Sequence, residues 1–162
     1  MRRCVFFILA LVFICGCEQP KQTQKTKKKS TIHAQKSYLA DAIQHLKEAD
    51  PNAAIRSFDE AIKQDPLNPE SYLLLGQVYM HMRDYPRAID TFAASVRVAP
   101  DEGDGYYYLA MCHGLMGNIE FAVSNAQKSI EVFRRIQDEE KFMRALALLQ
   151  GLMQTQEPPE AE

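Results

Sequence analysis

The sequence predicts an all-α fold made of three helix-turn-helix units and one further helix at the C-terminal end. Two observations predict this fold. Tyr38, Tyr72 and Tyr106 recur at a spacing of 34 residues, and a period of this length indicates repeated supersecondary units. Within the middle period, residues fall at i, i+3, i+4 and i+7, which is the spacing of one face of an α-helix. These residues are Tyr72, Leu75, Gly76 and Tyr79.

Small residues recur at the same spacing and predict where the two helices of a unit cross. The three sets are Ala42, Gly76 and Ala110; Ala54, Ala88 and Ala122; and Ala61, Ser95 and Ser129. Residues without bulk let two helix backbones approach, and neighbouring aromatic rings fill the space around the contact. We therefore expect each period to fold as an antiparallel helix pair.

Capping residues and prolines predict the helix boundaries. Asp50, Asp84 and Asn118 lie one period apart, and each is a residue type that caps a helix N-terminus, here the start of a second helix. Pro66 and Pro100 are expected to end the second helices. Proline has no backbone N–H to donate, and it disfavours helical conformation in the residue before it.

The middle unit carries a known family pattern. Its Tyr72-x2-Leu75-Gly76-x2-Tyr79 segment is followed by Ala88-x3-Phe92 and then by Pro100. The segment that contains this pattern, residues 35–136, resembles three tetratricopeptide repeats. Their boundaries are 35–68, 69–102 and 103–136. The resemblance implies a right-handed α-solenoid, in which successive helix pairs stack on one another.

The outer units depart from the family pattern. In the first unit Asp41 replaces the usual leucine and His45 the usual tyrosine. In the third unit His113 replaces the tyrosine and Ala126 the phenylalanine. Arg134 replaces the proline, so the second helix of this unit is expected to continue past the usual end.

Residues 137–154 are predicted to form a capping helix that Asp138 opens. Its apolar stripe consists of Phe142, Ala145, Leu146, Leu149, Leu152 and Met153, with Glu140, Lys141 and Arg144 on the outside. Stacked repeats need closed ends, so this helix is expected to cover the last unit. Alternatively it forms a dimer or partner surface, because Met143 and Leu148 widen the stripe beyond one face. Residues 155–162 are predicted to be a disordered tail.

The N-terminal segment predicts export and lipidation. Arg2 and Arg3 precede an apolar run over residues 5–14, so residues 1–16 are interpreted as a signal peptide. Ile14-Cys15-Gly16-Cys17 resembles a bacterial lipobox, which implies that Cys17 carries a diacylglycerol and a further acyl chain such as palmitate. The alternatives are an ordinary signal peptide with incidental cysteines, or an uncleaved anchor.

Charge is distributed unevenly along the chain. Residues 18–36 hold six lysines against Glu18, whereas residues 37–162 hold 11 Lys and Arg against 20 Asp and Glu. Residues 17–34 are therefore predicted to be a flexible basic linker, which either lies on anionic lipid headgroups or extends into solvent. The acidic domain argues against nucleic acid as a partner. Glu18 stands where an aspartate often retains lipoproteins at the inner membrane, and it favours the outer membrane.

Sequence motifs for catalysis or metal binding are not found. The chain has no glycine-rich phosphate loop, no GxSxG and no HExxH motif, so we expect no enzyme activity, cofactor or metal. Removal of the signal and lipidation of Cys17 would leave Cys112 alone, which excludes an internal disulfide. His45 and His113 occupy the position of a packing aromatic and are expected to be structural.

The resemblance implies that the first helix of each unit lines a concave groove for another protein. The predicted groove residues are Leu39, Ile43 and Leu46; Leu73, Gln77, Met80 and His81; and Tyr107, Met111 and Leu115. The groove is mostly apolar and lacks the basic cluster by which some family members hold a terminal carboxylate. Such a surface suits a helix or extended strand of a partner. Alternatively these residues pack against neighbouring helices or a second copy.

These expectations lead to one function and several alternatives. The first is a lipid-anchored adaptor or scaffold that binds another protein at the periplasmic side of the bacterial cell envelope. One alternative is an assembly lipoprotein resembling the pilotins of pilus and secretion machines. Another is a regulatory subunit that recruits an enzyme, and a third is a soluble protein that forms homo-oligomers.

Overall fold

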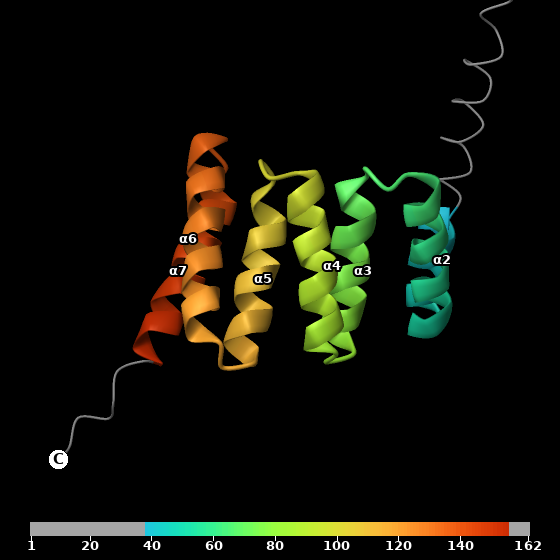
Figure 1. Ribbon diagram of the computed structural model, residues 1–162, viewed down its shortest axis with the longest axis horizontal. Coiled ribbons are helices and arrows are strands. Elements are labelled where there is room, and N and C mark those ends of the chain that lie inside the picture. The colour runs from blue at the N-terminus through green and yellow to red at the C-terminus, as the bar shows by residue number, and fades with distance from the viewer. Residues whose placement is uncertain (1–37, 156–162) are drawn as a thin grey trace, which may run out of the picture.

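The computed structural model describes residues 38–155, and all regular secondary structure in this range is helical (Figure 1). A helix over residues 38–47 is followed by α2 (Pro51–Gln64), α3 (Pro69–His81), α4 (Tyr85–Val98), α5 (Gly103–Leu115), α6 (Ile119–Arg135) and α7 (Glu139–Gln154). The first unit pairs the 38–47 helix with α2, the second pairs α3 with α4, and the third pairs α5 with α6. The expected fold class, an α-solenoid of helix-turn-helix repeats, is confirmed.

The helix starts follow from the capping residues. At the start of α2, Asp50 accepts a hydrogen bond from the Ala53 amide at 2.9 Å, and Asp84 does the same for Arg87 at 3.2 Å at the start of α4. These bonds satisfy amides that have no partner within the helix. Asn118 stands at the corresponding N-cap of α6, but its side chain makes no capping hydrogen bond.

The turn inside each unit depends on one residue in the left-handed region. Ala49, Arg83 and Gly117 lie one period apart and have φ of 58°, 61° and 76°. The amide after each of them donates back to the carbonyl five residues earlier, in every case at 2.9 Å. This is the Schellman arrangement that ends a helix. Gln137, with φ of 59°, makes the same turn between α6 and α7.

Helix α6, the second helix of the third unit, is longer than α2 and α4, as expected. α2 ends at Gln64 and α4 at Val98, one period apart, whereas α6 continues three residues past the corresponding Val132 to Arg135. Arg134 occupies the place of Pro66 and Pro100, so nothing interrupts the backbone hydrogen bonds there.

In the second and third units a large ring packs on a small residue. A Cβ added to Gly76 would lie 2.5 Å from Phe92, and one added to Gly103 would lie 2.6 Å from Phe133, so both positions require glycine. Two buried serines add hydrogen bonds across the same pairs. Ser95 donates to the Pro69 carbonyl at 3.2 Å and Ser129 to the Gly103 carbonyl at 3.1 Å.

The last helix, α7, packs on the third unit. Its buried Leu152 contacts a cluster with Ala110, Ala122 and Ala126, and Leu148 and Leu149 pack beside it. Met143 and Met153 remain about half exposed, at 53% and 56%. Whether these exposed methionines contact another protein stays a prediction.

Residues 38–155 contain no helix long and apolar enough to cross a bilayer. The predicted signal peptide, Cys17, the basic linker and residues 156–162 lie outside the described residues.

Candidate functional site

The predicted groove residues lie on the first helices of the three units, and none of them is fully buried. Six are half-buried: Leu39, Leu73, Gln77, Met80, Tyr107 and Met111. Four are exposed: Ile43, Leu46, His81 and Leu115. Leu39, Leu73 and Met80 rest partly on the core, so the packing of the helix pairs holds them in place. These first helices therefore present accessible apolar side chains.

A cavity of about 510 Å³ brings three of these residues together, and we call it the first-junction pocket. It contains Leu46 from the 38–47 helix and Gln77 and His81 from α3. The remaining lining residues are Ala49, Pro51, Leu74, Val78 and Met82, which were not predicted. The repeat pattern gave no sign that the packing there leaves a space.

Tyr107 has a different environment from the one expected. It lines a small gap with Asp104, Phe133 and two basic residues of α7, Lys141 and Arg144. Its ring meets Tyr108 edge-on, with centroids 5.5 Å apart. The third part of the predicted groove is therefore bordered by α7.

The prediction that Lys141 lies on the outside of α7 is wrong. Lys141 is half-buried, its ammonium lies 2.7 Å from Asp104 of α5, and it stands 5.6 Å from the centre of the Phe133 ring. The hydrogen bond to Asp104 raises the pKa of Lys141. An ammonium group on an apolar helix face is stable when a carboxylate and an aromatic ring receive it.

The first helices carry little positive charge. Across residues 38–47, α3 and α5, Lys47 is the one Lys or Arg. A partner's terminal carboxylate would need several basic side chains or bidentate arginines to hold it. The surface of these helices therefore fits an apolar segment and does not fit a carboxylate terminus.

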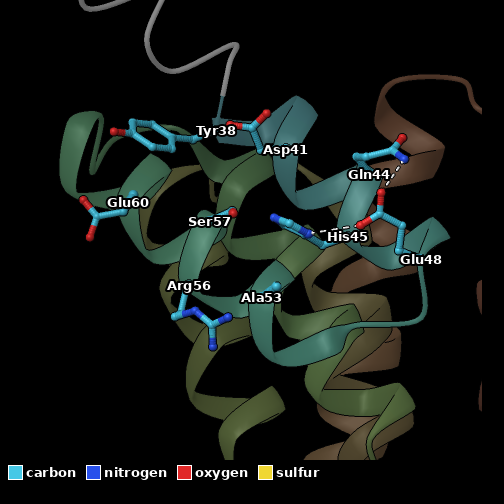
Figure 2. A pocket seen from close by; sticks show the side chains of 9 residues that line it. All are labelled: Tyr38, Asp41, Gln44, His45, Glu48, Ala53, Arg56, Ser57 and Glu60. Atoms are coloured by element: carbon cyan, nitrogen blue, oxygen red, sulfur yellow. Dashed lines mark hydrogen bonds and ion pairs between the residues drawn. The ribbon is translucent and has the colours of Figure 1, made fainter.

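A second cavity, of about 350 Å³, lies on the first unit between the 38–47 helix and α2 (Figure 2). Asp41, Gln44 and Glu48 line it on one side, and the Gln44 amide donates to Glu48 at 2.8 Å. One period later, Leu75 and Val78 replace Asp41 and Gln44 and are buried. This face of the first unit, with its polar residues, is therefore better suited to contact solvent than to pack against another helix pair.

The titratable residues near the core serve packing. Cys112 is fully buried, and burial raises its pKa to about 11, so the thiol stays protonated at neutral pH. His113 stacks on Phe121 with centroids 5.4 Å apart, and burial lowers the pKa of His113. Among residues 38–155, no three His, Cys, Asp or Glu side chains lie close enough together to hold a metal ion.

Comparison with known proteins gives one family and a consistent fold. Residues 45–112 match the family model for the tetratricopeptide repeat. Mouse Superkiller complex protein 3 is 24% identical over 110 residues, which are 68% of this chain and 7% of that protein. The chain therefore spans only a small part of this relative.

Solved structures with the same fold are similar over most of the chain. The TPR2B domain of yeast Sti1, in a complex with pHsp70, has a TM-score of 0.72 at 13% identity and covers 76% of this chain and 99% of that one. The Yersinia enterocolitica chaperone SycD, with a peptide of the translocator YopD, has a TM-score of 0.66 at 17% identity, covering 75% and 94%.

PcrH, in complex with the chaperone-binding region of PopD, has a TM-score of 0.70 at 17% identity and covers 75% of this chain and 92% of that one. The 34-residue spacing, the stacked helix pairs and the family-model match lead to the same conclusion. Residues 45–112 of this chain are therefore tetratricopeptide repeats, and the solved structures show the same fold.

Proposed function

We propose that this chain is a non-catalytic module that binds a segment of another protein along the first helices of its units. The observation that carries the proposal is the row of accessible apolar side chains on these helices, together with the first-junction pocket. Apolar grooves of this kind take up peptide segments. The structures of Sti1, PcrH and SycD named above also hold segments of other proteins, which supports a binding role.

The groove can be tested with two charged substitutions. Leu73→Glu with Met80→Glu places carboxylates among apolar side chains, and a bound apolar segment would then leave them desolvated. We expect the double variant to lose the partners that the full chain captures by crosslinking and mass spectrometry. Leu67→Glu is the control, because Leu67 is 76% exposed between α2 and α3. Unchanged capture by the double variant, with helicity intact by circular dichroism, would reject the groove.

The proposed setting is the periplasmic side of a bacterial envelope membrane, with the outer membrane favoured. This part rests on the sequence Ile14-Cys15-Gly16-Cys17 and on Glu18. Several acyl chains at Cys17 would provide a lasting anchor, whereas one chain gives only marginal binding. We expect metabolic labelling with a fatty acid to mark the full chain and not Cys17→Ala. Absence of label from both would remove the membrane from the proposal and leave the groove unaffected.

A further inference from the structure

The two junctions between successive units differ in the size of their side chains. The first-junction pocket is lined by Leu46, Ala49, Pro51 and Leu74. One period later the corresponding residues are Met80, Arg83, Tyr85 and Tyr108. Met80 is about as large as Leu46, and the other three are larger than their counterparts. Three of the four, Met80, Tyr85 and Tyr108, pack against the core of the protein. At the second junction, Tyr85 and Tyr108 therefore pack against the core at the positions where the smaller Pro51 and Leu74 border a cavity at the first junction.

The Tyr108 ring shows how this filling works. It stacks on Phe92 with centroids 5.1 Å apart and an interplanar angle of 12°. At the corresponding position, Leu74 is half-buried beside the cavity. The volume of about 510 Å³ lies within the range of roughly 300–1,000 Å³ that is typical of ligand sites. The first-junction pocket is thus large enough to receive a bulky side chain.

The walls of the pocket define the chemistry of its occupant. None of the eight residues that line it is Asp, Glu, Lys or Arg, and six of them are apolar. Gln77 and His81 are the two polar residues, and they lie one helical turn apart on α3. The occupant is therefore uncharged and apolar where it enters the pocket, with hydrogen-bonding groups beside it.

Gln77 favours an extended backbone for that occupant. Its side chain is half-buried in the wall of the pocket, and its side-chain amide can both donate and accept a hydrogen bond. Most N–H and C=O groups of a bound helix are already paired within the helix, so they are poorer partners for Gln77. An extended segment offers both groups freely.

We infer that the first-junction pocket receives one large apolar side chain, of leucine to phenylalanine size, from a segment of another protein bound in an extended conformation. Gln77 pairs with the backbone of that segment next to the inserted side chain. This inference rests on the proposed function, because it names the kind of segment that the groove takes. The first two units, rather than all three, would then determine which peptide sequences the protein binds.

The probe is a library of random linear peptides displayed on phage and selected on the full chain. We expect the selected peptides to share one large apolar residue and to tolerate proline outside that residue. Leu74→Tyr fills the pocket with the residue that the second junction already carries. It should weaken binding by roughly 10- to 100-fold, which corresponds to the loss of one buried apolar side chain. Leu67→Tyr makes the same change at an exposed site and should bind as the wild type does.

A second variant tests the pocket independently, in case Leu74→Tyr does not fold. Ala49→Arg narrows the pocket from the turn, and Arg83 shows that arginine is accommodated at this left-handed position. The role of Gln77 is tested by a double-mutant comparison. Methylation of the peptide nitrogen next to the inserted residue should weaken binding to the wild type and have little further effect on Gln77→Met.

The outcomes separate this inference from the function on which it rests. If Leu73→Glu with Met80→Glu abolishes peptide binding while Leu74→Tyr and Ala49→Arg do not, the groove stands and the pocket assignment is wrong. If the peptides bind as helices and proline abolishes binding, the extended conformation is wrong. If no peptide is enriched, or if all variants bind equally, the proposed binding groove and the assignment of the pocket are both rejected.

Discussion

At the residue scale, the turn inside each unit stores conformational strain in two of its three copies. Gly117 adopts a positive φ at no steric cost, whereas Ala49 and Arg83 adopt it with a Cβ present. We expect Ala49→Gly and Arg83→Gly each to raise the free energy of unfolding by about 1 kcal/mol, measured by urea denaturation.

The third turn supplies the reverse test. Gly117→Ala should lower the free energy of unfolding by about 1 kcal/mol. A Cβ at Gly117 would meet no neighbour within 4 Å, so this loss reports the backbone conformation alone. Equal stability of all three variants and the wild type would show that the left-handed turn carries no strain.

The buried thiol of Cys112 makes the free energy of unfolding depend on pH in the alkaline range. Burial raises the pKa of this thiol from 9.0 to about 11, so the folded state holds its proton where the unfolded state has lost it. The stability that this group contributes is present below pH 9 and is lost as the pH rises towards 11.

Cys112→Val isolates the effect of this thiol on stability. Val78 occupies the corresponding buried position in the second unit, so valine is expected to fit. Urea denaturation at pH values from 9 to 11, the range between the two pKa values, should show the wild type losing stability relative to Cys112→Val. Parallel curves for the two proteins would contradict the burial of the thiol.

At the element scale, helix α7 is held on the third unit by the buried Ala145 and Leu152, by partly buried leucines beside them, and by the Lys141–Asp104 ion pair. Leu152 is 8% exposed and lies against Gly114, whereas Met153 next to it is 56% exposed. Leu152→Ala should lower the free energy of unfolding by about 2–5 kcal/mol, and Met153→Ala should change it by less than about 0.5 kcal/mol. Hydrogen exchange should also show α7 opening in Leu152→Ala. Equal effects of the two substitutions would mean that α7 does not pack on the third unit.

The sequence predicted most element boundaries because they depend on local chemistry. Asp50, Asp84 and Asp138 cap the helices that follow them, and Arg134 lets α6 continue where a proline would end it. The environment of Lys141 could not be predicted in the same way. The helical period shows which side of α7 is apolar, but only the fold brings Asp104 of another helix against it.

At the scale of the whole molecule, the repeat predicted the surface better than it predicted the cavity. Position in the repeat placed Leu46, Gln77 and His81 on the first helices, and the first-junction pocket contains all three. The pocket itself arises because Ala49 and Leu74 are smaller than their counterparts one period later. A shared pattern predicts what the units have in common and cannot show how two junctions differ.

If the first helices form the binding surface, site-specific photo-crosslinking in the source cell will capture a partner from these helices and not from the second helices. A photoreactive residue at Met80, on a first helix, is compared with one at Asp90, which is exposed on the second helix α4. We expect a covalent adduct with another protein from position 80 and none from position 90. Adducts from position 90 alone, or the same adducts from both positions, would contradict this expectation.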